Sequence, residues 1–128
     1  MAKVKAVTKF VRISPQKMRL VADLVRGKSV EQAFDILFSV DKKASGIILK
    51  NLKSAVSNAE HNHGMLRANL VLSEVRVDGG PKIKRYRPRA RGMSNAIRRP
   101  TSHLSIALDL PKLAKANQAN KAKETKNV

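Results

Sequence analysis

The chain lacks cysteine and tryptophan altogether, and aromatic side chains make up only 3% of its 128 residues. Without cysteine it can form no disulfide bond, zinc knuckle or cysteine nucleophile, which suits a reducing cytosol. Any hydrophobic core must therefore be aliphatic, built from valine, leucine, isoleucine and alanine. No apolar run approaches the roughly 18 residues of a membrane-spanning helix, so we expect no partner in a membrane.

Signals for export, catalysis and metal binding are missing or weak. The opening residues, MAKVKAVTKF, include lysines but no apolar stretch typical of a signal peptide. There is no GxGxxG or P-loop motif, and the nine carboxylates show no pairing suited to acid–base catalysis. His61 and His63 lie near Glu60 without the further ligands of a zinc site. We expect no catalytic residue, no metal and no cofactor, with a ribonuclease using His61 or His63 and a lysine as an alternative.

Positive charge dominates what is present. Lysine and arginine number 27 against 9 acidic residues, for a net charge of +18. Residues 79–101, GGPKIKRYRPRARGMSNAIRRPT, contribute +8 of that charge and contain no acidic residue. So dense a cation cluster repels itself and has few apolar groups to bury. We therefore expect it to need a polyanion, and nucleic acid is the natural one.

The N-terminal residues predict a strand followed by helices. Residues 3–13 are β-branched and alternate with lysine. They should place Val4, Ala6 and Phe10 on one side of the strand, and Lys3, Lys5 and Lys9 on the other. The lysine side could contact phosphates, or could simply keep an edge strand from pairing with another chain.

Three helices are expected after this strand. Ser14 and Pro15 form a start signal for the first, which Gly27 should close, and Ser29 should cap the second. Asp41 can cap a longer third helix that ends near Gly64. The predicted buried stripes are Met18, Val21, Leu24 and Val25; Val30, Ala33, Phe34 and Leu37; and Ala44, Ile48, Leu52, Ala55, Val56 and Ala59.

From Ala68 the apolar period becomes two, which predicts a strand. Its two faces should carry Val71, Val75 and Val77, and Leu70 and Leu72, respectively. A further strand from Ser102 to Leu110 should bury Leu104, Ile106 and Leu108. The two strands are natural antiparallel partners, and the basic segment is then the connection between them.

The basic connection itself should form a projecting ribbon. Arg85, Arg87, Arg89 and Arg91 recur at every second residue, which places them on one face of an extended strand. Pro88 disfavours a helix there. A hairpin at about 78–102, with its tip near 90–95, could project roughly 40 Å at about 3.3 Å per residue. A solvated, disordered loop is the alternative interpretation.

Arginine suits folded RNA because it binds phosphate through two hydrogen bonds and stacks on bases, and Tyr86 could stack on a base too. The candidate RNA-binding residues are Lys82, Lys84, Arg85, Arg87, Arg89, Arg91, Arg98 and Arg99, together with Arg12 and Lys17 in the domain. An architectural DNA-binding protein with basic arms is an alternative that competition between RNA and duplex DNA would separate. We expect one domain, residues 1–110, and a basic tail, 111–128, that is disordered unless it binds RNA.

Several segments, in order along residues 3–110, resemble the bacterial family of large-subunit ribosomal protein twenty-two. They are RISPQKMRLVADLVRGK (12–28), AFDIL (33–37), LKSAVSNAEHN (52–62), VDGGP (77–81), KRYRPRARG (84–92) and RRPTSHLSI (98–106). The resemblance implies an α+β fold, with three helices packed on a three-stranded antiparallel sheet and a long protruding basic β-hairpin.

The resemblance also implies a non-enzymatic structural role in the cytoplasm. Family members bind and organise 23S rRNA in the large ribosomal subunit, assist its assembly, and contact neighbouring ribosomal proteins. Their hairpin lines the exit tunnel and meets the nascent polypeptide, and changes near its tip are associated with macrolide resistance. The matching tip residues here are Arg85, Tyr86, Arg87, Pro88, Arg89, Ala90, Arg91 and Gly92.

Overall fold

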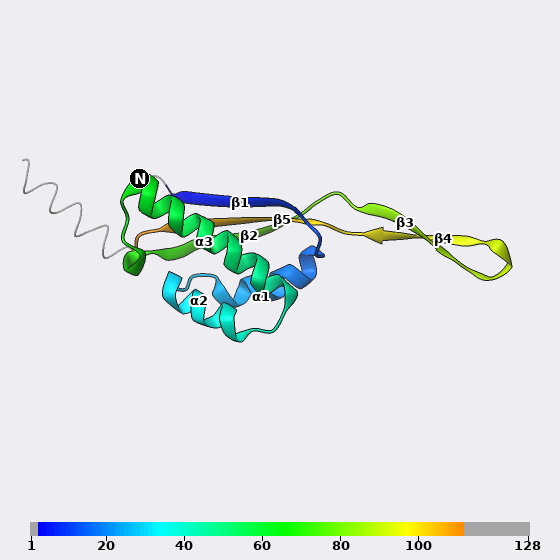
Figure 1. The fold of residues 1–128 in the computed structure, drawn as a ribbon, viewed down its shortest axis with the longest axis horizontal. Helices are drawn as coiled ribbons and strands as arrows, with labels where there is room; N and C mark the ends of the chain where they lie inside the picture. The colour runs from blue at the N-terminus through cyan, green and yellow to red at the C-terminus, as the bar shows by residue number, and fades with distance from the viewer. Residues whose placement is uncertain (1–2, 112–128) are drawn as a thin grey trace, which may run out of the picture.

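The computed structural model describes residues 3–111. The predicted tail, apart from Pro111, lies outside the described residues. Three helices cover one face of a three-stranded antiparallel sheet, and a two-stranded hairpin projects from the end of the sheet (Figure 1). This confirms the expected α+β architecture. In chain order the elements are β1 (Val4–Val11), α1 (Pro15–Val25), α2 (Val30–Ser39), α3 (Lys43–His63), η1 (Arg67–Asn69), β2 (Val71–Gly79), β3 (Ile83–Pro88), η2 (Ala90–Gly92), β4 (Ser94–Arg99) and β5 (Ser102–Asp109).

The first two helices begin where their capping residues predict. The hydroxyl oxygen of Ser14 accepts a hydrogen bond from the backbone N–H of Lys17 at 3.4 Å, ahead of Pro15. Ser29 accepts in the same way from Gln32 at 3.4 Å. Each hydroxyl satisfies one of the amide donors that a helix leaves unpaired in its first turn.

The predicted cap of α3 is wrong, although its predicted end at Gly64 is confirmed by a left-handed φ of 60°. Lys42, not Asp41, is the N-cap residue, and its side chain makes no capping bond. Ser45 instead donates its hydroxyl to the carbonyls of Val40 and Lys42, at 2.9 and 2.6 Å. The turn before α3 is therefore held by a side chain from the first turn of the helix itself.

The predicted helical stripes are buried, with one exception in α1. Leu24 is 48% exposed, and Ala22 is buried in its place. The buried stripe of α1 is centred between Val21 and Ala22, and at 3.6 residues per turn Leu24 lies roughly 110° around the helix from that centre. A narrow stripe suffices because α1 packs mainly on β2, while α3 covers β1 and β5.

β5 is the central strand, and a bulge in β1 changes which residues face the core. Thr8 pairs with Leu104, but Val11 rather than Phe10 pairs with Ser102. Phe10 has φ 57° and is 62% exposed, whereas Val11 is buried. The prediction that Phe10 shares a face with Val4 and Ala6 is therefore wrong, because the extra residue reverses the alternation beyond it.

β2 contains a second bulge that overturns the predicted faces of this strand. Leu72 pairs with Leu108, but the next pair is Glu74 with Ala107. The extra residue places Leu72 on the same face as Val75 and Val77, and all three are buried. Leu70 is buried with them at the entrance to the strand, and Val71 is half-buried.

Arg19 of α1 and Arg26, the C-cap residue of that helix, cover the free edge of β2. Arg19 donates from Nε and Nη2 to the carbonyl of Val77, at 3.3 and 3.1 Å. Arg26 donates from the same two atoms to the carbonyl of Val75, at 3.2 and 2.9 Å. These bonds protect an edge strand that could otherwise pair with another chain.

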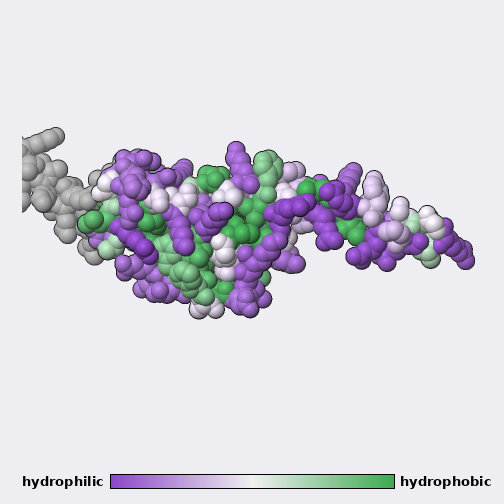
Figure 2. All heavy atoms as spheres, viewed as in Figure 1, coloured by the Kyte–Doolittle hydropathy of each residue, from purple (hydrophilic) through white to green (hydrophobic). Residues whose placement is uncertain are grey.

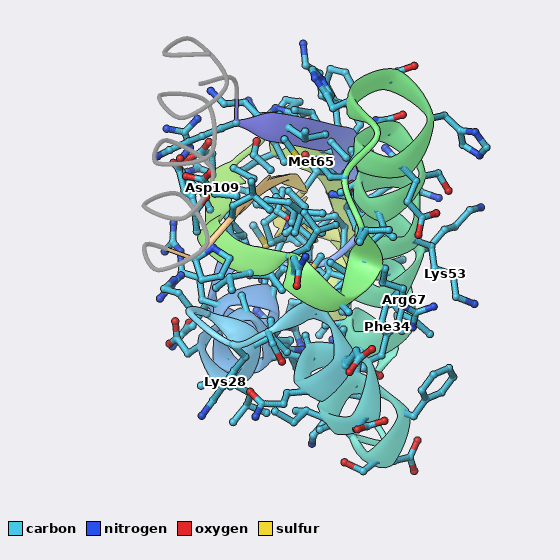
Figure 3. All side chains as sticks on the ribbon, turned by 90° about the vertical axis from the view of Figure 1, so that its left-hand side faces the viewer. Lys28, Phe34, Lys53, Met65, Arg67 and Asp109 are labelled. Carbon is cyan, nitrogen blue, oxygen red and sulfur yellow. The ribbon has the colours of Figure 1, made fainter. Side chains whose placement is uncertain are left out.

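A cation–π contact joins η1 to α2 on the helical side. The guanidinium of Arg67 lies 4.5 Å from the centre of the Phe34 ring, and Figure 3 shows the two side chains next to each other. Lys53 extends outward from α3 in the same view.

Candidate nucleic-acid interface

The basic segment forms the predicted hairpin between β2 and β5. β3 and β4 pair continuously from Ile83 opposite Arg99 to Pro88 opposite Ser94. The turn contains two left-handed residues, Arg91 with φ 57° and Gly92 with φ 69°. These residues confirm a tip near 90–95.

The hairpin has no core of its own. None of the side chains between residues 81 and 99 is buried, and the most enclosed are Ile83 and Ile97, which are half-buried. Figure 2 shows hydrophilic residues along most of the projection, with small hydrophobic areas near its base. A two-stranded ribbon without a hydrophobic face is marginally stable in water.

The pairing register divides the cations between the two faces of the ribbon. Arg85, Arg87 and Arg99 share one face with Ile83 and Ile97. The other face carries Lys84, Tyr86 and Arg98, as the alternation of side chains along paired strands requires.

The predicted face of four arginines is wrong at the tip. Arg85 and Arg87 lie within β3, but the strand ends at Pro88, and Arg91 lies in the left-handed turn. The chain has to reverse direction there, so the two-residue alternation cannot continue through the tip.

Like charges oppose each other across the ribbon. Lys84 lies directly opposite Arg98, a placement that destabilises a strand pair. Among the described residues, no ion pair joins a hairpin cation to a carboxylate. Arg85 donates from Nη1 only to the neighbouring carbonyl of Lys84, at 2.9 Å. The ribbon thus presents cations whose charges no carboxylate within residues 3–111 neutralises.

A basic groove lies where the hairpin leaves the domain, with a volume of about 950 Å³. Its cationic lining residues are Arg12, Lys17, Lys42, Lys43, Arg85 and Arg99, and its other lining residues are Ile13, Ser14, Leu20, Val21, Ala44, Ile83, Pro100 and Thr101. The groove brings the two domain residues predicted to bind RNA together with two from the hairpin. Lys42 and Lys43 were missed, because their adjacency to the groove depends on how α3 packs beside α1.

The remaining candidates are spread along the ribbon. Lys82, Lys84, Arg87 and Arg98 are exposed on its arms, and Arg89 and Arg91 are exposed at its end. The segment predicted to line a tunnel, residues 85–92, begins well before the tip, since Arg85 also lines the groove at the base. Contact of these residues with RNA, or with a tunnel lumen, stays a prediction.

Two of the histidines lie at the exposed end of α3 and the third lies in β5. His61 and His63 lie in the last turn of α3, and His103 Nδ1 accepts the backbone N–H of Phe10 at 3.0 Å. The rings of His103 and Phe10 meet edge to face, with centres 5.0 Å apart. Within residues 3–111 there is no cluster of metal-ligating side chains and no helix long and apolar enough to cross a membrane.

Comparison with known proteins gives consistent matches. The sequence profile described as Ribosomal protein L22p/L17e matches residues 6–109. Large ribosomal subunit protein uL22 of Rippkaea orientalis is 49% identical over 107 residues, covering 84% of this chain and 89% of that protein. The proteins of the same name from Fusobacterium nucleatum subsp. nucleatum and Thermoanaerobacter sp. are 52% and 50% identical over 104 residues, covering 81% of this chain and 94% of each relative.

Proposed function

Because the chain belongs to the ribosomal protein L22p/L17e family, we propose that it binds and organises 23S rRNA, with its hairpin lining the nascent-peptide exit tunnel. It is a structural constituent of the large ribosomal subunit, and the family is not enzymatic. The ribonuclease alternative is therefore set aside. The finer assignments to RNA and tunnel rest on the physical properties of the hairpin.

One observation carries the RNA-binding proposal: the hairpin is cationic along its whole length and has no buried side chain. Internal packing therefore stabilises the folded hairpin little, and repulsion between its cations destabilises it. Packing between RNA segments would supply phosphates to both faces of the ribbon. Binding and ordering of the hairpin should then occur together.

The shape of the molecule supports the tunnel assignment. The domain holds the hairpin by its base and directs the tip far from the three-stranded sheet (Figure 1). A domain on the surface of the subunit could in this way deliver Arg89 and Arg91 into its interior. Neighbouring ribosomal proteins would contact the domain, and the nascent polypeptide would pass the tip. By joining RNA segments far apart, the protein would assist assembly.

Competition binding tests the RNA assignment against the DNA alternative. Labelled 23S rRNA fragments should be displaced by unlabelled structured RNA at much lower concentrations than by duplex DNA of the same length. Replacing Arg87 and Arg98 by glutamine should weaken RNA binding more than the same change at Lys50 and Lys53, which are exposed on α3. Preference for duplex DNA would overturn the proposal.

The absence of cysteine allows a direct test of the tunnel assignment, because any cysteine introduced is the chain's single thiol. Ribosomes carrying Arg91→Cys should crosslink, through a thiol-reactive probe, to a stalled nascent chain. Ribosomes carrying Lys53→Cys provide the control, since Lys53 lies on the domain. Crosslinking from position 53 but not from position 91 would contradict a tunnel-lining tip.

A further inference from the structure

We propose that the basic groove at the base of the hairpin holds one unpaired RNA nucleotide, with its base on the aliphatic floor and its flanking phosphates on the surrounding cations. This inference rests on the proposed RNA-binding function and specifies the ligand of one part of the surface.

The rim of the groove is suited to phosphate. Six cationic side chains line it, and no carboxylate of the part of the chain that the structure describes does. Within residues 3–111, none of these six forms an ion pair. Two of the six donate to backbone carbonyls, Lys43 from Nζ to Arg12 at 3.5 Å and Arg85 from Nη1 to Lys84 at 2.9 Å, and neither bond neutralises the charge. Their charges are therefore available to an incoming anion.

The floor of the groove is suited to a base rather than to phosphate alone. Leu20, which is 69% exposed, and Ile83, which is half-buried, both line the groove. Ile13, Val21 and Ala44 continue the apolar lining. These three are buried already, so the apolar surface open to a ligand is that of Leu20 and Ile83. A phosphate would leave that surface in contact with water, whereas the face of a base would cover it. The combination of apolar and cationic lining residues matches the two chemistries of a nucleotide, its base and its phosphates.

Size favours an unpaired nucleotide over a helix. A volume of about 950 Å³ lies within the range of about 300–1,000 Å³ typical of small-ligand sites. Bases in an A-form duplex are stacked and unavailable, while bulges and loops present bases that can turn outward. The occupant should therefore come from a bulge, loop or junction.

Because the groove lies between the domain and the hairpin, a nucleotide bound in it would hold the two together. Lys17 and Leu20 belong to α1, whereas Ile83 and Arg85 belong to β3 and Arg99 to β4. A ligand touching all of these residues would connect the domain to the hairpin. Occupancy would fix the direction in which the hairpin leaves the domain.

Three RNA hairpins of the same stem sequence provide the test. One carries a single bulged 2-aminopurine, the second an abasic bulge at the same place, and the third a fully paired stem. Binding is measured by fluorescence anisotropy, with the wild-type protein and with Leu20→Ser, Ile83→Ser and Leu24→Ser. Leu24→Ser is the matched control, since Leu24 is exposed on α1 but does not line the groove.

The wild-type protein should bind the bulged base roughly tenfold more tightly than the abasic bulge, as burial of an aliphatic contact would give. Leu20→Ser and Ile83→Ser should remove most of that preference, and Leu24→Ser should keep it. Equal affinity of the wild-type protein for the base and abasic bulges would overturn the nucleotide site and leave a surface that binds phosphate. The same conclusion would follow if Leu24→Ser lost as much of the preference for the bulged base as Leu20→Ser and Ile83→Ser. Polyglutamate added at the same concentration of negative charges as the RNA phosphates should not displace the bulged RNA. If it does, the nucleotide site is overturned in favour of a site for an acidic peptide. Failure to bind all three RNAs at low salt would contradict the proposed function itself.

Discussion

Gly80 lies against Thr101 so closely that a Cβ atom at position 80 would be 2.4 Å from the Thr101 hydroxyl oxygen. The N–H of Gly80 donates to the carbonyl of Thr101 at 2.8 Å, and the Thr101 hydroxyl donates to the carbonyl of Pro81 at 2.7 Å. These contacts hold together the two chain segments that connect the sheet to the hairpin. They set where the projection leaves the domain.

Replacing Gly80 by alanine should destabilise the protein. The added methyl group would also approach the Thr101 backbone to 3.2 Å, so the two segments must separate. We expect the free energy of unfolding to fall by about 1–3 kcal/mol, the usual effect of overpacking. Gly46→Ala is the control, because an added Cβ on that residue of α3 meets nothing within 4 Å. It should raise stability by about 0.5–1 kcal/mol; an unchanged denaturation midpoint in Gly80→Ala would contradict the steric argument.

Arg26→Lys should destabilise the junction of α1 with β2. Lysine cannot reproduce the two guanidinium bonds to the Val75 carbonyl, and we expect a loss of about 1 kcal/mol. Arg76→Lys is a matched change at an exposed residue of β2 whose ion pairs are on the surface, and it should cost about 0.5 kcal/mol or less. Urea denaturation of both variants measures the difference. An equal fall in the free energy of unfolding of both variants would mean that the bonds from Arg26 to the Val75 carbonyl do not stabilise the protein more than a surface ion pair does.

In the free protein, amides of the hairpin should exchange hydrogen much faster than those of β5. β5 is the central strand with Leu104, Ile106 and Leu108 fully buried, whereas the hairpin is paired along its length without any buried side chain. Binding of 23S rRNA should slow exchange across residues 82–99. Strong protection of this range without RNA would show that the hairpin is stable alone.

Lys84→Glu should have opposite effects on the hairpin and on RNA binding. Glutamate would face Arg98 directly and replace a repulsive pair by an attractive one, a change of about 0.2–1 kcal/mol for each cross-strand pair. Exchange in the free hairpin should slow while RNA affinity falls. Lys53→Glu carries the same charge change on α3 and should leave hairpin exchange unaltered. If both variants change hairpin exchange equally, the effect is one of net charge and not of pairing.

RNA affinity should fall steeply with salt. With six phosphate contacts, the plot of log affinity against log salt concentration should have a slope of about −4 to −5, using about −0.7 to −0.9 per contact. Titrations from 50 to 300 mM salt measure it. A flat response would count against phosphate as the main ligand.

Local signals in the sequence were enough to predict the helices. Ser14 and Ser29 act on donors within their own first turns, and Gly64 ends α3 with a conformation that glycine adopts easily. The stripe of α3 from Ala44 to Ala59 follows from helical spacing alone. The prediction of Asp41 as the cap of α3 failed because the helix begins one residue later, with Lys42 as its N-cap, and the Ser45 hydroxyl bonds to the carbonyls of the preceding turn.

The sequence also determined that a cationic connection lies between two antiparallel strands, since charge density, Pro88 and strand alternation are properties of short segments. Only the tertiary structure decided which side chains face the core near Phe10 and Leu72, because each bulge exists relative to the residues of β5 that it opposes. The groove likewise required α1, the start of α3 and the hairpin to meet, and no local pattern encodes a contact among segments that are far apart in the sequence. Short-range chemistry thus determined the elements, and long-range packing determined their faces and the site between them.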